Sequence, residues 1–537
     1  VRSLAAQPVS SVAIEDIHRR SDGNPFFIEQ LLAARADVGT HLPSELRDVL
    51  MARVDALQQP ARTIIEVASV SGDDVGHDDL ASVARQPADR LREQLRELVD
   101  AALLLPTRTA DGADAYSFRH TLVREAVYAS LLPAERRRLH QAWAETLSGH
   151  GAGTGPSLAH SIEVAHHRRE ARDPGALEAS VAAGDHAMRS CSFSAATREY
   201  EAALQLWASE ASSESAIDHV DLLVRFGRAA YYSKQDREAV AAYREALDET
   251  DDDARRSLIH WRLARSLWAT GEWALATEAY EEALRTAPHE PPEARIRALA
   301  GLAQTYMANG QFRRSLPLGE QALERARAIG DRQLEGHILT TLGMDRAWLG
   351  EPDAGQAALV SALRIALELE DPDDVGRAYV CRVETLPLGG QTDEALVVAA
   401  EGLEVATRMG TMLSYGPSLH VAAAYTAFQA GRWGLAREHL ARADELIAPS
   451  EMGPYRACHV LHMLAEQGDP DAHGVWQEAS RRMDELPPSN YLVQLLVGAV
   501  VLEAYEGRYA EAAAIAEEAI SVAARTDASI RASELAR

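Results

Sequence analysis

The sequence has almost no lysine and very little cysteine. Lys234 is the only lysine, so nearly all of the 54 basic residues are arginine. Cys191, Cys381 and Cys458 lie far apart and form no C-x-x-C motif. We therefore expect neither a disulfide framework nor a zinc knuckle, and we expect the reducing cytoplasm as the location.

The shortage of lysine bears on nucleotide chemistry. A phosphate-binding loop has the form G-x-x-x-x-G-K-[ST], in which the lysine ammonium contacts the β and γ phosphates. Lys234 lies in "YYSKQDR", with no glycine loop before it. A G-x-S-x-G nucleophile elbow is absent too, and Cys191 has no sequence context of a nucleophile. We therefore expect that this chain is not by itself an enzyme.

Net positive charge and long apolar runs are also missing. The formal net charge is −27, which excludes binding of nucleic acid or an anionic membrane through the overall field of the chain. No run approaches eighteen apolar residues, and the first residues show no signal-peptide pattern. We therefore expect DNA contact only through a domain that is not in this chain, and no membrane contact.

What the sequence does contain favours helix. Aromatic residues make up only 6%, whereas Ala, Leu, Glu and Arg are abundant. A chain of 537 residues is too long for one ordinary core, so several domains or a repeat array are expected. The predicted fold class is predominantly all-α.

Three regions differ in pattern. Residues 1–41 have helical spacing on both sides of a turn from Gly23 to Pro25, and residues 42–149 combine short helices with one hairpin. Residues 150–537 are repetitive, and the stretch "GHGAGTGPS", 149–157, has the composition of a linker. We predict a helical lid remnant, a winged-helix domain and a repeat superhelix, in that order.

The winged-helix prediction for the second region is based on a hairpin after several helices. Helical spacing recurs over 43–57, 60–70, 78–85 and 87–102. Apolar flanks around Asp111-Gly112 predict two strands joined by a turn, and helical spacing then returns. Winged helices commonly bind DNA, but no basic recognition helix is visible, so we expect an internal regulatory role.

The third region repeats one unit with a period of roughly 37 to 43 residues, near that of tetratricopeptide arrays. A bulky residue opens the second half of the unit at Phe193, Trp273, Phe312, Trp433 and Tyr509. A small residue follows three positions later at Ala196, Ala276, Ser315, Ala436 and Ala512. Small residues let two antiparallel helices approach, and the bulky residue is expected to pack against the next unit.

We count about nine tetratricopeptide-like units, the eighth of which is degenerate because His473 replaces the small residue. They start near Leu177, Val220, Ser257, Ile296, Gly336, Gly376, Pro417, Pro454 and Val493. Such pairs stack into a superhelix, because one pair cannot bury its apolar face alone. The last unit has no obvious polar cap, so the array is expected to continue beyond Arg537.

The first helix of each unit should line the concave side of the superhelix, which predicts an effector groove. Its polar and aromatic residues suit a small-molecule or peptide site. The alternative is that several of them belong to the core between units. The predicted groove residues are Arg228, Tyr231, Tyr232, Trp261, Arg265, Trp268, Met344, Trp348, Arg377 and Tyr425, with Gln304, Met307, His337, Glu384 and Phe428 as further members.

No metal site is predicted. His160, His166 and His167 occur close together, but their spacing is not H-E-x-x-H and no third ligand accompanies them. We interpret them as histidines on a solvated helix face.

Taken together, the motifs resemble one family. "RSDGNPFFIEQLL", "LPSELRDVLMARVDAL" and "YSFRHTLVREAVYASLLPAERRRLHQAWAETL", followed by helical repeats, are similar to the part after the ATPase in large ATP-dependent LuxR-type transcriptional regulators. These belong to the signal-transduction ATPases with numerous domains, the group of the maltose-regulon activator. The resemblance implies a repeat sensor whose effector, with ATP, converts an ADP-locked monomer into an active oligomer.

The resemblance also implies a nucleotide site in the intact protein. Gly23 and Pro25 correspond to the G-x-P turn, whose proline packs on the adenine of ATP or ADP. His120 corresponds to the winged-helix histidine that contacts the ADP β-phosphate, and Arg119 and Arg124 are weaker alternatives. The ordinary readings remain open: Pro25 can simply start a helix, and His120 can simply cap one.

Two departures limit the resemblance. The Walker segment is missing upstream, and no basic helix-turn-helix appears before Arg537. We therefore expect a fragment without the ATPase engine and the DNA reader, with no nucleotide bound to it alone. The alternatives are a protein-interaction scaffold and the regulatory tail of a nucleotide cyclase.

Overall fold

The computed structural model describes residues 44–72, 74–109, 112–149, 157–210, 217–288, 292–447, 449–481, 483 and 488–527. The predicted lid helices, with Gly23 and Pro25, lie outside these residues. The chain divides into two compact units, 1–186 and 187–537.

The first unit contains a winged helix. Its elements are α3 (Ser44–Asp55), α4 (Gln59–Ser71), β1 (Asp74–Gly76), α5 (His77–Ala84), α6 (Ala88–Asp100), β2 (Leu104–Arg108), β3 (Asp114–Phe118), α7 (Thr121–Ser130), α8 (Pro133–Ser148) and α9 (Leu158–Ala171). The three strands pair antiparallel in the order β1-β3-β2. A helix, a strand, two helices and a hairpin in this sequence confirm the predicted winged helix. Strand β1 was not predicted, because three residues are too few for an alternating pattern to be recognised.

The core of this unit is apolar and continuous. Buried side chains from α4, α6, the sheet, α7 and α8 form one cluster, and its largest member is Trp143, only 1% exposed. The indole Nε1 of Trp143 donates to the carbonyl oxygen of Val67 at 3.1 Å, so the one polar atom of that side chain is paired. Trp143 also stacks on His167 of α9, so the first compact unit extends past the predicted boundary at 149/150. His167 is 0% exposed, so the prediction that it lies on a solvated helix face was wrong: α8 and the core of the first unit cover that face.

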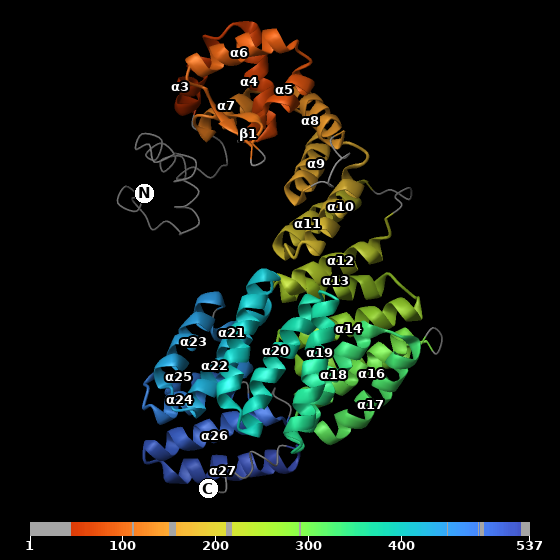
Figure 1. Cartoon of the computed structure of the whole chain (residues 1–537), viewed down its shortest axis with the longest axis vertical. Helices are drawn as coiled ribbons and strands as arrows, with labels where there is room; N and C mark the ends of the chain where they lie inside the picture. Colours follow the sequence, from red (N-terminus) through yellow and green to blue (C-terminus); the bar gives the residue numbers. More distant parts are fainter. Residues whose placement is uncertain are drawn as a thin grey trace. The chain divides into compact units, whose positions relative to one another are not determined.

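The repeat array consists of nine pairs of helices, counted from α10 to α27 within the described residues (Figure 1), and the boundary between the two units falls within α10. The first helices are α10 (Ala176–Arg189), α12 (His219–Tyr232), α14 (Asp253–Ala269), α16 (Glu293–Ala308), α18 (Arg332–Trp348), α20 (Pro372–Thr385), α22 (Met412–Gln429), α24 (Pro449–Glu466) and α26 (Asn490–Tyr505). The second helices are α11 (Phe193–Glu210), α13 (Asp236–Asp248), α15 (Trp273–Thr286), α17 (Phe312–Ile329), α19 (Pro352–Glu368), α21 (Thr392–Arg408), α23 (Trp433–Leu446), α25 (Asp471–Arg481) and α27 (Tyr509–Ala524). All nine predicted starts fall within first helices, which confirms the repeat prediction; a short 3-10 turn, η1 (Leu386–Gly389), follows α20.

Small residues sit where paired helices touch, as predicted. Ala196, Ala276, Ser315 and Ala436 are fully buried, and Ala512 is 6% exposed. Helices α18 and α19 approach each other closely, because a Cβ added to Gly355 would lie 2.6 Å from the backbone oxygen of Gly343.

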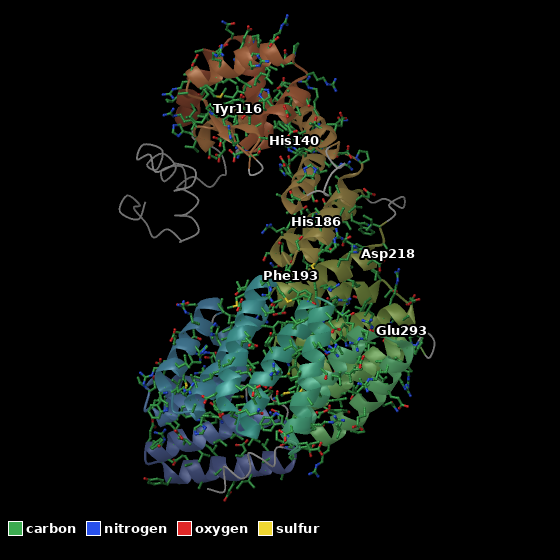
Figure 2. All side chains as sticks on the ribbon, viewed as in Figure 1. Tyr116, His140, His186, Phe193, Asp218 and Glu293 are labelled. Carbon is green, nitrogen blue, oxygen red and sulfur yellow. The ribbon has the colours of Figure 1, made fainter. Side chains whose placement is uncertain are left out.

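The prediction for the bulky residues is only partly right. Phe193 (Figure 2) and Phe312 are buried, at 4% and 0% exposure. Trp433 and Tyr509, at the equivalent position in later pairs, are 42% and 72% exposed. These two side chains are not buried against a neighbouring pair. The local sequence pattern determines the position of the residue on its own helix, but it does not determine whether another helix covers that position.

The first helices form the inner row of the array. Each of them from α12 to α24 packs against the first helix of the next pair as well as against its own partner. Helix α20 lies between pairs three to five and pairs seven to nine (Figure 1). Among the residues that the structure describes, none of the helices could span a lipid bilayer.

Candidate functional site

A charged cluster at the start of α20 joins helices that are distant in sequence. Arg265 of α14 donates from Nη2 to the carboxylate of Asp373, 108 residues away. The hydroxyl of Tyr415, in α22, donates to the other oxygen of the same carboxylate. The side chain of Asp373 is only 4% exposed and that of Arg265 is 14% exposed. Helices of pairs three, six and seven therefore meet at one buried ion pair.

Aromatic rings surround the guanidinium of Arg265. Its Cζ lies 5.1 Å from the ring centroid of Tyr231 and 5.1 Å from that of Trp261. Nη2 of Arg265 also lies 3.4 Å from the hydroxyl of Tyr231. Cations are attracted to ring faces, more strongly where water is excluded. These rings therefore hold the guanidinium in place towards Asp373.

A second polar cluster lies next to the first and is centred on His337 of α18. Nδ1 of His337 is 2.7 Å from Oδ1 of Asp374 and 2.7 Å from Nη1 of Arg377. Nε2 lies 3.2 Å from Oε1 of Gln304, and Arg377 also donates to Thr341. A proton on Nδ1 makes that nitrogen a donor to Asp374, whereas without it the same nitrogen accepts from Arg377.

The two clusters share an indole. The ring of Trp261 lies beside Arg265 and 6.2 Å, centroid to centroid, from the ring of His337. The indole Nε1 of Trp261 is buried and has no hydrogen-bond partner among the residues that the structure describes. Most buried polar groups in proteins are paired, so this donor is available to a polar ligand.

Burial and nearby charges shift the pKa values of four side chains in these clusters. Burial lowers the pKa of His337, and the nearby Arg377 lowers it further, so the imidazole is neutral at pH 7. Burial alone would raise the pKa of Asp374, but His337 and Arg377 outweigh it and lower the pKa. Burial opposes the charge of Arg265 as well, yet Asp373 raises its pKa above the ordinary value. Burial and Asp373 both raise the pKa of Tyr415, which therefore keeps its proton. The interior thus holds two ion pairs and one neutral histidine.

Helix α20 presents a third polar contact near its other end. The hydroxyl of Tyr455 donates to Oε1 of Glu384 at 2.6 Å, and that of Tyr491 lies 3.5 Å from Oε2. Tyr455 also packs on the ring of His459, with centroids 4.6 Å apart. Burial and Glu384 raise the pKa values of both tyrosines. Polar side chains along α20 therefore reach five other first helices in the array.

The start of α20 is set by an N-cap that the sequence shows clearly. Oδ1 of Asp371 accepts from the backbone N–H groups of Asp373 and Asp374, at 3.0 Å each. This satisfies donors that would otherwise have no partner at the helix start. The cap fixes the first turn, so the next two carboxylates point in different directions, one to α14 and α22 and the other to α18.

The structure brings together some of the predicted groove residues. Tyr231, Trp261, Arg265 and Arg377 lie in the two polar clusters, along with His337 and Gln304. Glu384 lies in the third contact. Arg228 is exposed, with its Cζ 5.9 Å from the ring of Tyr232. Tyr232 itself is 5% exposed and stacks on Phe193.

Other predicted groove residues belong to the apolar core, which corrects their assignment. Met344 and Trp348 are 2% and 3% exposed and pack with Met307, Phe312 and Leu359. Tyr425 and Phe428 are buried in another apolar cluster, to which Trp268 contributes a partly buried ring. These side chains point between helices, because an aromatic residue on an inner helix covers its neighbour as readily as it lines a groove.

The sequence did not identify Asp373, Asp374 or Tyr415 as site residues. In "LEDPDDVG" the aspartates match the usual preference for acidic residues at a helix start. One of the three, Asp371, does serve that purpose. Only the superhelix shows that the other two reach across to helices of other pairs.

His120 lies directly after β3, at the N-cap position of α7. Its backbone oxygen accepts from the N–H of Val123, whereas its side chain does not make a capping hydrogen bond. The neighbouring helix α6 carries three arginines and four acidic residues between Ala88 and Asp100. The position equivalent to a recognition helix is therefore not basic.

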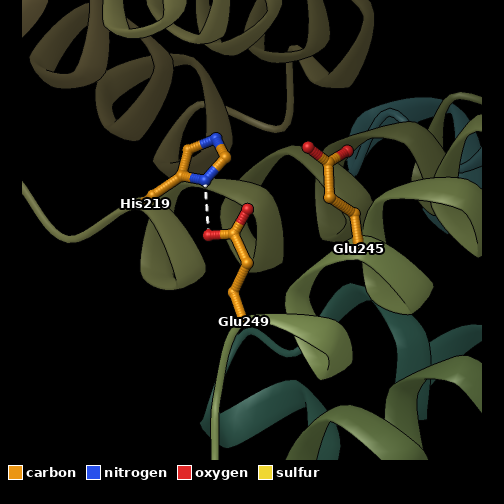
Figure 3. A group of neighbouring side chains, drawn as sticks. All are labelled: His219, Glu245 and Glu249. Carbon is orange, nitrogen blue, oxygen red and sulfur yellow. Dashed lines mark hydrogen bonds and ion pairs between the residues drawn. The ribbon is translucent and has the colours of Figure 1, made fainter. Parts of the chain in front are cut away.

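Figure 3 shows another group of titratable residues, which has ligand types suited to a metal ion. Nδ1 of His219 is 2.7 Å from Oε2 of Glu249, and Glu245 lies one helical turn before Glu249. The imidazole stacks on Trp207, with centroids 3.7 Å apart. Both glutamates are exposed to solvent, and a hydrogen-bonded His–Glu pair on a surface accounts for this arrangement without an ion.

Two cavities lie away from the polar clusters. An open one of about 600 Å³ in the first unit is lined by charges of both signs, including Arg53, Glu93, Arg96 and Glu97. A smaller one of about 210 Å³ lies in the array where Cys191, Phe193 and Tyr232 meet Gly410 and Leu413. Burial raises the pKa of the Cys191 thiol, which disfavours its thiolate form.

Comparison with known proteins does not assign a family. No protein-family model matches the sequence, and no curated protein matches it. Similar solved structures include a Rap protein complexed with competence and sporulation factor, with 13% identity over 65% of this chain and 98% of that chain and a TM-score of 0.46. Another is a signal-transduction ATPase with a tetratricopeptide repeat sensor from Pyrococcus horikoshii, with 12% identity, 90% and 72% coverage and a TM-score of 0.40. A third is the Rap conjugation gene regulator of plasmid pLS20 with the Phr* peptide, with 13% identity, 75% and 94% coverage and a TM-score of 0.42.

Proposed function

We propose that this chain is the regulatory, effector-sensing segment of an ATP-dependent transcriptional regulator. The observation that supports this most is the cluster of buried ion pairs around α20, in an array whose buried side chains are mostly apolar. Replacing buried ion pairs by well-packed apolar residues is often neutral or stabilising. An array that only had to span a distance would therefore not need Arg265, Asp373, Asp374 and Arg377 inside it. Perturbed pKa values also cluster at functional sites.

In this proposal the inner row binds the effector and the winged helix relays the nucleotide state. The effector is a small molecule or a protein segment with hydrogen-bond acceptors, because Trp261 and the arginines offer donors. ATP or ADP would be bound by the intact protein only, with Gly23, Pro25 and His120 as contacts. A histidine N–H can donate to a phosphate oxygen. The mixed charge of α6 supports a relay function of the winged helix rather than DNA binding.

Calorimetry with fractionated metabolite pools tests the effector site. We expect a saturable heat of binding with the purified chain, which Arg377→Gln abolishes because the guanidinium and its contacts with His337 and Thr341 are lost. Arg364→Gln is the matched control: Arg364 is 59% exposed on α19 and pairs only with Glu368 there. Equal binding by wild type and Arg377→Gln would contradict an effector site in the inner row.

A protein partner is the second candidate function. Its support is the exposed apolar surface of the last pair, where Tyr505, Tyr509 and Ile520 are 69%, 72% and 57% exposed. A pull-down separates the two functions. A partner recovered in stoichiometric amount, whose binding is lost in Tyr509→Ser while no metabolite gives heat, favours the scaffold.

His120 provides a separate test of the nucleotide relay. In the full-length regulator, His120→Ala should raise effector-independent output, because a contact that stabilises the ADP-locked state is removed. Unchanged basal output in a reporter assay would leave His120 with a structural role only. The isolated chain should show no ATP hydrolysis, and robust hydrolysis would contradict the proposal as a whole.

A further inference from the structure

Several contacts in the array connect pairs that are not neighbours in the stack. Beyond the Arg265 ion pair, Oγ of Ser414 in α22 donates to the backbone oxygen of Tyr232, 182 residues away, at 2.8 Å. The turn at Gly410 lies directly against the backbone of Cys191. Trp268, one turn after Arg265, packs against the cluster that holds Tyr425. Pairs one to three therefore touch pairs six and seven.

Contacts of this kind are additional to the usual energetics of a repeat array. In such an array each pair interacts with its neighbours, and stability is a sum of those terms. The cross contacts close one turn of the superhelix onto the next. Because each neighbouring interface has its own apolar core, the closing contacts can separate without any pair unfolding.

The closing interface has a charged centre. Arg265, Asp373 and Tyr415 form its most buried polar part, and Tyr231 and Ser414 add two further hydrogen-bonding groups. A buried ion pair gains little over solvated charges, because the desolvation cost offsets the attraction. Removing one partner is costly, however, because the other charge is then left buried and unpaired. Such an interface has two well-defined states, closed with the pair formed or open with both charges in water.

We propose that the Arg265–Asp373–Tyr415 cluster is a latch, a set of contacts that holds the superhelix closed. We propose further that the effector of the inner row acts by breaking these contacts, so that the superhelix opens. The statement that an effector opens the latch rests on the proposed function. The latch itself rests only on the contacts within the chain. A carboxylate-bearing effector has the right chemistry to open it, because it can replace Asp373 as the partner of the guanidinium. Asp373, once released, is a charge that favours water.

Hydrogen exchange of the purified chain without any effector tests the latch. We expect Asp373→Asn to speed amide exchange by roughly tenfold or more at the end of α12 and the start of α22, where the closing contacts lie. Exchange at α4 and α6, whose buried side chains belong to the apolar core of the first unit, should be unchanged. Far-UV circular dichroism confirms that the helices remain.

The matched control is Asp444→Asn. Asp444 of α23 accepts two hydrogen bonds from Arg456 of α24, at 2.9 and 2.8 Å, and the arginine side chain is 13% exposed. This ion pair joins consecutive helices, so its loss should leave exchange at α12 and α22 unchanged. The double variant Arg265→Asp with Asp373→Arg restores the pair in reverse and should bring exchange back towards the wild-type rate.

Three results would overturn the latch. They are wild-type exchange in Asp373→Asn, the same acceleration in Asp444→Asn, and no recovery in the reversed pair. A failed search for an effector, with accelerated exchange in Asp373→Asn, would refute the proposed function and leave the latch intact. Conversely, if the wild-type chain binds an effector but Asp373→Asn does not change amide exchange, the latch is refuted and the proposed function is retained.

Discussion

The winged-helix unit and the repeat array solve the same problem, burying the apolar faces of short helices, in different ways. The first unit gathers them into one apolar core, where even the indole nitrogen of Trp143 is paired with a backbone oxygen. The array divides its apolar residues among several separate clusters along the stack. Between these it retains charged groups such as Arg265 and Asp374. The comparison teaches that helices sharing one core cannot move apart without exposing that core. Helix pairs with separate cores can break the contacts between them while each pair stays folded.

The largest expected effect on stability comes from a substitution in the single core of the first unit. Trp143→Ala should lower the free energy of unfolding of the first unit by about 3–5 kcal/mol, because it leaves a large cavity and removes the hydrogen bond from the indole to Val67. Urea unfolding followed by circular dichroism measures it. Trp433→Ala in the array is the control, since that side chain is 42% exposed. A loss below about 0.5 kcal/mol is expected there. Equal losses would mean that the two regions do not differ in this way.

A medium effect tests close helix packing in the array. Gly355→Ala should cost about 1–3 kcal/mol, because the new Cβ would meet the backbone oxygen of Gly343, which cannot move aside alone. Gly434→Ala is the matched control, in α23, where an added Cβ meets nothing within 4 Å. That change should stabilise the helix by up to about 1 kcal/mol. Thermal unfolding of both variants is the measurement, and a neutral Gly355→Ala would contradict the close approach of α18 and α19.

The smallest expected effect is a pH dependence in the first unit. His140 (Figure 2) is 1% exposed and hydrogen-bonds Tyr128 and His167. Burial first, then the nearby His167, His166 and Arg136, lower its pKa to about 3. Because the unfolded chain binds a proton near pH 6.5 and the folded one does not, stability is full above that pH and falls below it. The slope is about 1.4 kcal/mol per pH unit.

His140→Gln removes this proton-binding group and should therefore flatten the pH dependence of unfolding between pH 7 and pH 5. Urea titrations at both pH values compare the variant with wild type. His160→Gln, in α9 of the same unit, controls for the substitution itself. An equally steep loss of stability in His140→Gln would assign the acid sensitivity to other groups.

Much of the fold could be predicted, because its signals are local. Asp111-Gly112 marked the wing, and the small residues from Ala196 to Ala512 marked the paired helices of the array. The helix period, the turn chemistry and the size of a contact residue all act over a few positions. The exposure of Tyr509 could not be predicted, because it depends on whether another pair covers that face.

The candidate site could be predicted only in part. Arg265, Trp261 and Arg377 were identified as inner-row residues from their helix positions. Their partners, Asp373 and Tyr415, were not, since nothing local distinguishes an aspartate that caps a helix from one that reaches another helix. The same limit explains why Met344 and Trp348 were placed in a groove although they are buried in the core.

The sequence by itself determined the helical class, the wing and the nine helix pairs, because each depends on contacts within about forty residues. The tertiary structure alone decided that α14 meets α20 and that α22 meets α12. The pitch of a superhelix is the sum of small rotations between successive pairs. Slight differences in packing at every interface therefore decide which distant residues come into contact.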